Sequence, residues 1–179
     1  MSSPKKTIQE QIGSIYPTDT EALASFASRY GDDPAYESAL IDCVDAEDEA
    51  ISIASTWLIK HAADGGHRFG AEATSALCVR LDGVSAWESA LHLAQSVGAF
   101  ELSPEFAARL VRWLVPMIGH ERPFLRAWSL DGLCKVAARH GRYRARAIEA
   151  VDDAGDDSAA SVRARVRRLR RAFDYLESP

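Results

Sequence analysis

Cysteines and long apolar runs are both scarce in this sequence, and this narrows the class of protein that it encodes. The three cysteines among 179 residues, Cys43, Cys78 and Cys134, are widely spaced, form no CxxC pair and lie within apolar helical patterns. Such spacing argues against a disulfide framework or a zinc site, and it predicts small buried side chains. No apolar run approaches the roughly 20 residues needed to cross a bilayer, so we expect no membrane partner.

The beginning of the chain lacks the features of a secretory leader. Residues 1–15 contain Lys5 and Lys6 but neither an apolar core nor a cleavage site of small residues, and a signal peptide has both. We therefore expect a cytoplasmic protein. With 47% hydrophobic and 26% charged residues, the chain has the size and composition of one globular domain spanning 1–179.

Motifs of the common catalytic sites are absent as well. The sequence contains no GxSxG, no P-loop and no dinucleotide-binding glycine pattern. His120-Glu121 does not continue as the HExxH pattern of zinc proteases. The histidines do not have the spacing of a zinc site, which needs three or four convergent ligands, and we expect them to be solvated or to cap helices: His61, His67, His92, His120 and His140. We predict no enzyme activity, no metal and no cofactor, although a triad assembled only in the fold leaves no such motif.

Charge is unevenly distributed along the chain. Residues 1–120 contain 8 basic and 17 acidic side chains, a net charge of −9, whereas residues 121–179 contain 13 and 9, a net charge of +4. The asymmetry predicts two surfaces with different partners. The overall charge of −5 argues against a general nucleic-acid binder. Acidic clusters at 45–49 and 152–157 precede or open expected helices, where negative charge is favourable, and they lack the full ligand spacing of a calcium site.

What the sequence does contain is a helical pattern that recurs about every 37 residues. The longer helix of each expected pair begins near Glu47, Val84, Arg122 and Ser158, at intervals of 37, 38 and 36 residues. Sustained period-2 alternation, which would indicate strands, is nearly absent. A fixed period of this size is typical of a solenoid, in which each helix pair buries its apolar face against its neighbours. We predict an all-α superhelix of about four pairs.

The expected helices follow from apolar periodicity and from residues that start or stop helices. After a poorly defined start at 4–15 and a leading helix at 19–30, both within an N-terminal cap of 1–33, four pairs fill 34–176: 34–45 with 47–64, 70–81 with 84–98, 104–118 with 122–140, and 144–154 with 158–176. The third pair is apolar on most sides and is expected to be the most buried, with Phe124, Trp113 and Trp128 in its core. Trp57 is also expected in the core.

Several residues predict where individual helices begin and end. Asp33 and Ser103 each stand before a proline and are expected N-caps, and Ser85 with Glu88 has the spacing of a capping box.

Glycines follow the expected helix ends, where a left-handed residue is common: Gly65, Gly66, Gly119 and Gly141. Pro116, within a helical pattern, predicts a kink or an early break.

The helix pairs resemble HEAT repeats, whose second helix typically opens with an acidic residue, followed by an aliphatic-Arg pair and small residues. Asp157 precedes Val162-Arg163-Ala164, and Leu125-Arg126-Ala127 has the same pair with His120 at the acidic position. Asp82 precedes Trp87-Glu88-Ser89-Ala90, without the arginine, and Ile51-Ser52-Ile53-Ala54 keeps only the apolar and small positions. The resemblance covers about 34–176, and armadillo-like superhelices remain an alternative. It implies a curved stack whose second helices line a concave binding surface.

Two hypotheses for function follow. The first is a non-catalytic scaffold or adaptor that binds another protein on its concave face, with Trp87, partly exposed, and Glu88 as contacts. The alternative is binding of a nucleic-acid backbone through the arginine-rich C-terminal helices, because arginine forks hold phosphates. The candidate binding residues of the arginine-rich part are Arg126, Arg163, Arg167 and Arg170.

Overall fold

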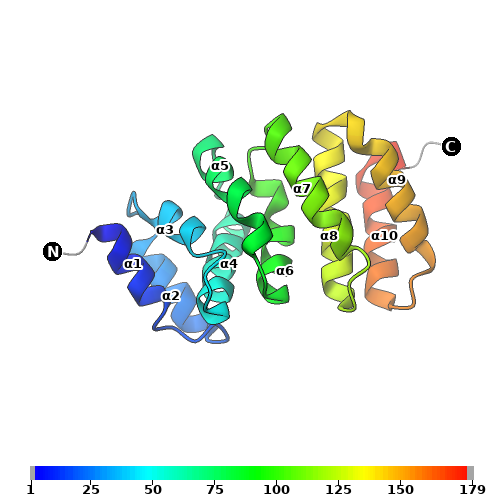
Figure 1. Cartoon of the computed structure of the whole chain (residues 1–179). Helices are drawn as coiled ribbons and strands as arrows, with labels where there is room; N and C mark the ends of the chain where they lie inside the picture. Colours follow the sequence, from blue (N-terminus) through cyan, green and yellow to red (C-terminus); the bar gives the residue numbers. More distant parts are fainter. Residues whose placement is uncertain (1–2, 177–179) are drawn as a thin grey trace. The chain divides into compact units, whose positions relative to one another are not determined.

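The computed structural model describes residues 3–176, and within them the chain is all-helical, as predicted. Its α-helices are α1 (Pro4–Ile12), α2 (Thr20–Tyr30), α3 (Tyr36–Asp42), α4 (Glu49–Asp64), α5 (Ala71–Arg80), α6 (Trp87–Ser96), α7 (Pro104–Met117), α8 (Pro123–Arg139), α9 (Arg144–Asp153) and α10 (Ala160–Ala172) (Figure 1). Short 3₁₀ turns follow several of them, at Leu81–Gly83, Val97–Ala99, Gly141–Tyr143, Ala154–Asp156 and Asp174–Leu176. Each expected long helix has a counterpart, and the poorly defined start contains α1.

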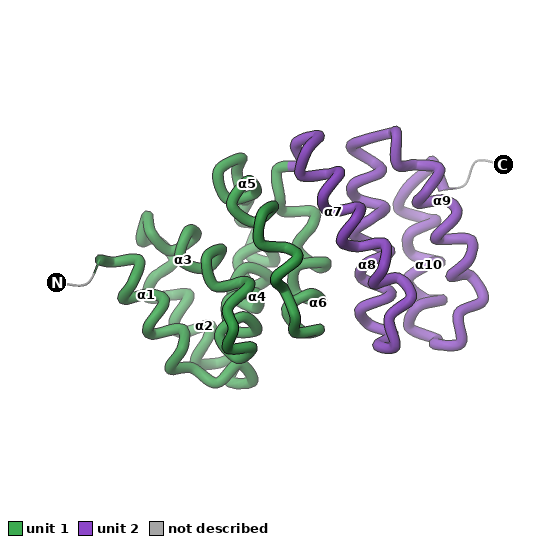
Figure 2. Tube along the Cα trace, viewed as in Figure 1, with its two compact units in different colours: residues 1–101 green, residues 102–179 purple. Residues whose placement is uncertain are grey.

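The chain divides into two compact units, Met1–Glu101 and Leu102–Pro179 (Figure 2). Unit 1 carries 6 basic and 16 acidic residues, a net charge of −10, and unit 2 carries 15 and 10, a net charge of +5. The charge asymmetry of the sequence therefore coincides with the boundary between the units. The expected single domain over 1–179 stays a prediction.

Unit 1 is organised around α4, which contacts α1, α2, α3 and α6. The fully buried side chains that form its centre come from successive helices: Ile8, Leu23, Leu40, Leu58, Leu77 and Leu93. The segment between α4 and α5 is fixed by Phe69, which is 2% exposed. Its amide donates to the Ala99 carbonyl at 2.9 Å, and its carbonyl accepts from the Glu101 amide at 2.9 Å. These bonds hold the glycine-rich loop against the end of α6.

Unit 2 is organised around α8, which lies beside α7 and α10 and also contacts α9 (Figure 1). Its core includes Leu130, Leu133, Val151, Val162 and Leu169, each at most 2% exposed. A helix packed on most sides was expected here, and most of α8 is buried.

The expectation that Phe124 is buried is wrong, because its side chain is 61% exposed. Phe124, Trp128, Asp131 and Lys135 follow each other at helical steps of 4, 3 and 4 residues, so they share one face of α8. That face carries Asp131 and Lys135, whereas Arg126 lies on the opposite side of the helix. Trp128 on it is only half-buried, whereas Trp113 is buried as expected. Trp57, in unit 1, is also half-buried rather than buried.

Of the N-caps predicted from Asp33, Ser85 and Ser103, only the cap at Ser103 is confirmed. Ser103 caps α7, its Oγ accepting from the Phe106 amide at 3.1 Å. Asp33 accepts from the Ala35 amide at 2.8 Å instead, and α3 begins only at Tyr36, so Asp33 forms a turn rather than the expected cap. The capping box of Ser85 and Glu88 is wrong, because α6 begins one residue later with Ala86 in the N-cap position and no side-chain cap.

Most of the glycines that follow helix ends do not have the left-handed conformation that the sequence predicted. Among the described residues only Gly66 has a positive φ, of 93°. Gly65, Gly119 and Gly141 therefore do not adopt the expected left-handed conformation, and Gly119 instead continues a 3₁₀-type turn with its amide donating to the Pro116 carbonyl. Helix α7 ends at Met117, one residue after Pro116, in line with the expected break.

Candidate functional site

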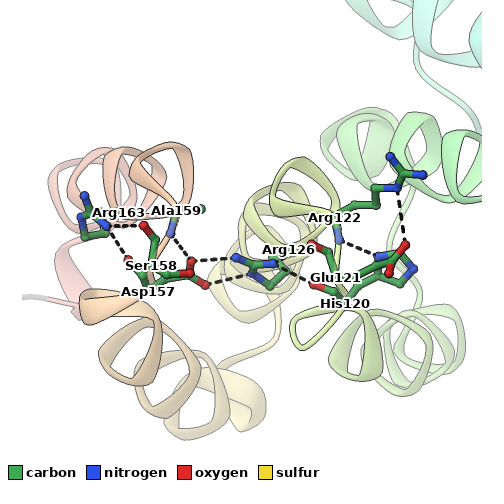
Figure 3. Close-up of polar contacts among 8 residues, drawn as sticks. All are labelled: His120, Glu121, Arg122, Arg126, Asp157, Ser158, Ala159 and Arg163. Atoms are coloured by element: carbon green, nitrogen blue, oxygen red, sulfur yellow. Dashed lines mark hydrogen bonds and ion pairs between the residues drawn. The ribbon is translucent and has the colours of Figure 1, made fainter.

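The most extensive polar contact of unit 2 joins α8 to the turn that precedes α10. Arg126 donates from Nε to Asp157 Oδ2 at 2.9 Å and from a terminal nitrogen to Oδ1 at 2.7 Å, a bidentate pair (Figure 3). Its other terminal nitrogen donates to the carbonyls of His120 at 2.9 Å and Glu121 at 3.1 Å. One planar guanidinium thus satisfies acceptors from the turn before α8 and the turn before α10.

Arg163 makes the same contact with its own turn, 37 residues further along the chain. It donates to the carbonyls of Asp157 at 2.5 Å and Ser158 at 2.9 Å. His120 and Asp157 stand six residues before their respective arginines, as the resemblance to HEAT repeats aligned them. Each arginine therefore closes the turn that leads into its own helix.

The Arg126–Asp157 pair is largely withdrawn from solvent, with the side chains 14% and 16% exposed. The hydrogen bonds from Arg126 hold the pKa of Asp157 below its usual value, with smaller help from the Ala159 amide and Arg163 and against the effect of partial burial. Both arginines were expected to bind a partner. Their guanidinium groups instead bind backbone and carboxylate within unit 2.

Neutral side chains occupy the corresponding positions of unit 1. Ser52 and Ser89, 37 residues apart, lie with their Oγ atoms 2.8 Å from each other, and Ser52 also donates to the Val44 carbonyl at 2.6 Å. Four residues on, Thr56 Oγ1 lies 3.2 Å from Nδ1 of His92. Burial, and secondarily the charge of Lys60, lowers the pKa of His92 to about 4. His92 is therefore a neutral, half-buried hydrogen-bonding group, which corrects the expectation of a solvated or capping histidine.

A second charged cluster, missed by the sequence analysis, surrounds Asp131 on α8. Asp131 is 6% exposed and accepts from Arg165 at 3.1 Å, and Nζ of Lys135 lies 2.6 Å from its other oxygen. The Arg165 guanidinium lies 3.7 Å from the centre of the Trp128 ring. The available signal was an acidic residue and a lysine four positions apart inside an apolar helix. This cluster fixes α10 on α8.

The two remaining candidate arginines, Arg170 and Arg167, differ in whether the side chain is already paired. Arg170 donates to Asp152 at 2.8 Å with both side chains well exposed. Arg167 is exposed, as are Arg168 and Arg171, and within residues 3–176 no hydrogen bond or ion pair engages these three. Arg171 follows Arg168 by three residues and Arg167 by four, so it lies beside both on the helix surface.

Trp87 and Glu88 lie in the first turn of α6, and both are half-buried, as expected for Trp87. They belong to unit 1, whereas the four candidate arginines belong to unit 2.

A groove of about 630 Å³ in unit 1 was not predicted. It is lined by α2, the loop before α3, α3 itself, the end of α4 and the loop that follows α4, with these polar and aromatic residues: Asp32, Asp33, Tyr36, Glu37, His61, His67 and Phe69. His67 Nε2 lies 2.7 Å from a Glu37 carboxylate oxygen, and the His67 ring meets Phe69 edge-on. No local motif announces this site, because its residues come from segments distant in the sequence.

Tyr36 is the most unusual residue of this groove. Its side chain is 7% exposed, and its hydroxyl has no hydrogen-bond partner among the described residues. Burial raises the pKa of Tyr36 to about 12, so the phenol stays protonated at neutral pH. Buried polar groups are normally satisfied, so this hydroxyl is an unused hydrogen-bonding group.

Two of the three thiols, those of Cys43 and Cys134, have little nucleophilic character. Burial, more than any charge, raises the pKa of Cys43 to about 11 and that of Cys134 to about 12, and the thiolate is the reactive form. Both side chains are buried as predicted, whereas Cys78 is half-buried. Within the described ranges, His, Cys, Asp and Glu form no group of three or more that could hold a metal ion. None of the described helices is long and apolar enough to cross a bilayer.

Comparison with known proteins gives no match to a family model, to a curated protein or to a solved structure.

We expect Asp157→Asn to lower the unfolding free energy by about 2 kcal/mol near neutral pH, because it weakens charge-assisted hydrogen bonds. Since folding depresses the pKa of Asp157, its contribution is complete above the usual value of 3.8 and disappears as the pH falls through the lower folded value. The difference between wild type and variant, measured by urea unfolding across acidic pH, should therefore shrink toward zero in acid.

Asp152→Asn is the matched control, because Asp152 forms an exposed pair with Arg170. Its effect should stay below about 1 kcal/mol at every pH. Equal effects of the two substitutions would show that the Arg126–Asp157 contact is an ordinary surface pair.

Proposed function

We propose that this chain is a non-catalytic protein-binding module, built as an α-α superhelix of HEAT-like helix pairs. The observation that carries the proposal is the repeated arginine contact. Arg126 and Arg163 bind the carbonyls of equivalent turns 37 residues apart. Repeats of this kind stack to form extended surfaces that bind partners.

The use of polar side chains also favours binding over catalysis. Arg126 and Asp157 neutralise each other, His92 is neutral in the interior, and the buried thiols of Cys43 and Cys134 stay protonated. A general base or nucleophile normally has a pKa poised near the working pH. The polar groups so far described instead hold the fold together and leave the charged surfaces for recognition.

The proposed contact for the protein partner includes Trp87 and Glu88 at the start of α6. A half-buried tryptophan offers a rigid apolar surface, and a neighbouring carboxylate offers a directional acceptor. Such aromatic anchors commonly dominate binding energy at interfaces. The cytoplasmic location expected from the sequence belongs to the same proposal.

Changing Trp87→Ala together with Glu88→Gln should reduce recovery of a stoichiometric protein partner at least tenfold in native co-purification after nuclease treatment, because loss of a hot spot costs about 2 kcal/mol or more. The matched control is Tyr16→Ala with Glu21→Gln, which alters an exposed aromatic and an exposed acid of the same unit. The control should recover the partner at the wild-type level. Undiminished recovery by a folded Trp87/Glu88 variant, checked by circular dichroism, would remove this surface from the proposal.

Nucleic-acid binding is the second candidate function, and the exposed arginines of α10 favour it. Arg167, Arg168 and Arg171 have no partner within the described part of the chain, and unit 2 has a net charge of +5. Each phosphate neutralised by such a group releases counterions, so affinity should fall steeply with salt.

If this candidate is correct, Arg167→Gln with Arg171→Gln should weaken duplex DNA binding and lower the slope of log K against log salt by about 2. The control double variant changes Arg112 and Arg139 to glutamine, two exposed arginines outside α10. Fluorescence anisotropy over a salt series provides the measurement. Equal slopes for both variants would indicate diffuse attraction and no site on α10.

A further inference from the structure

The groove of unit 1 brings together carboxylates without any accompanying lysine or arginine. Asp32 and Asp33 lie in the loop between α2 and α3, and Glu37 follows in α3. The lining also contains two histidines, His61 and His67. None of the described lining residues is a lysine or arginine. The surrounding unit has a net charge of −10. The groove therefore attracts cations.

Its acceptors are only partly used within the protein. Asp33 accepts from the Ala35 amide through one oxygen, and Glu37 contacts His67 through one oxygen. Asp32 is exposed, with no hydrogen bond or ion pair in the described part of the chain. The hydroxyl of Tyr36 is also unpartnered, but it is closed to solvent and lies beneath the groove surface. A ligand with several hydrogen-bond donors would satisfy the carboxylate oxygens that the protein leaves unused.

The lining also contains rings. Phe69 is 2% exposed and meets the His67 ring with the two planes at 80°. His61 stacks on Trp57, with ring centres 4.9 Å apart and planes 11° from parallel. Phe69 is covered and Trp57 lies outside the lining, so the exposed imidazoles of His61 and His67 are the rings on which a planar cation could stack.

We propose that this groove binds an arginine side chain presented by a basic segment of a partner protein. A guanidinium has five donors and no acceptor, which complements the carboxylates of Asp32 and Glu37. Its plane suits stacking on the exposed imidazole rings of His61 and His67. This inference rests on the proposed protein-binding function and specifies the class of partner.

The size of the groove favours an arginine within a peptide over the free amino acid. Grooves of 300 to 1,000 Å³ hold drug-sized ligands, and about 630 Å³ leaves space beside a guanidinium for residues that flank it. The negative charge of unit 1 would in addition attract further basic residues of the segment.

The test is a titration of the full chain with a capped pentapeptide that carries a central arginine, followed by NMR of the histidine rings. We expect the ring signals of His61 and His67 to shift in a saturable manner and those of His120 and His140 in unit 2 to stay unchanged. The same peptide with citrulline, an uncharged isostere, should bind at least tenfold more weakly. Equal binding of the citrulline peptide, or shifts spread over the histidines of both units, would overturn the proposal.

Two double variants test whether peptide binding depends on the carboxylates of the groove or only on the overall negative charge of unit 1. Asp32→Asn with Glu37→Gln should weaken the arginine peptide at least tenfold, whereas Glu21→Gln with Glu72→Gln, which removes the same charge from exposed positions outside the lining, should change affinity less than threefold. Asp32→Asn alone breaks no internal contact and should weaken binding about threefold. This single variant shows that the loss in the double variant does not come from misfolding. Equal losses in the two double variants would overturn the proposed site.

Two further outcomes distinguish this inference from the proposed function. Free arginine amide should bind at least tenfold more weakly than the peptide, and equal affinity would overturn a protein segment as the source of the side chain. If a protein partner depends on Trp87 and Glu88 while the peptide fails to bind the groove, the groove inference is wrong and the protein-binding function stands. If the peptide binds the groove but no protein partner co-purifies, the proposed function fails while the guanidinium site remains.

Discussion

The structure of unit 2 depends on one guanidinium group. Arg126 binds both oxygens of Asp157 and two carbonyls of the turn before its own helix. These four bonds close the turn before α8 and attach the turn before α10 to α8 in a single contact. An arginine is suited to this position because its donors are fixed in one plane and it keeps its charge when partly buried. Removing either partner would leave the other charge without compensation in a largely covered place.

Four residues spaced 37 positions apart make different contacts in the two units. Ser52, Ser89, Arg126 and Arg163 follow each other at intervals of 37 residues. In unit 1 the two serines bond to each other in the interior, and in unit 2 the two arginines bond to turns. Unit 1 thus needs no interior charge at this position, and many of its acidic residues lie at the surface, where they create the negative field around the groove. In unit 2 charged contacts join α8 to the turn before α10 and to α10 itself, and Arg167, Arg168 and Arg171 stay exposed.

The helices could be predicted from the sequence because their causes are local. The 37-residue spacing located the longer helices, and Ser103 before a proline was sufficient to identify a cap. Ser85 failed as a cap because its helix begins one residue later, a shift that depends on packing. Phe124 was misplaced for a similar reason, since the hydrophobicity of one residue does not show that its face of α8 carries Asp131 and Lys135.

The candidate sites were less predictable, since they depend on contacts between distant residues. Arg126 was identified as important, but its role could be assigned only when Asp157, 31 residues away, was seen to bind it. The groove joins Asp32 and Glu37 to His61 and His67 across two helices, and nothing in any one segment indicates that they meet. Tyr36 resembles any core tyrosine in sequence, and its unpartnered hydroxyl is visible only in three dimensions.

A double-mutant cycle on Arg126 and Asp157 tests most directly whether this contact joins α8 to the turn before α10. The unfolding free energies of the wild type, Arg126→Gln, Asp157→Asn and the double variant give the energy of interaction between the two side chains. The account predicts a favourable coupling of about 1.5 kcal/mol or more, as for hydrogen bonds between charged groups. Additive effects, with a coupling within about 0.5 kcal/mol of zero, would contradict it.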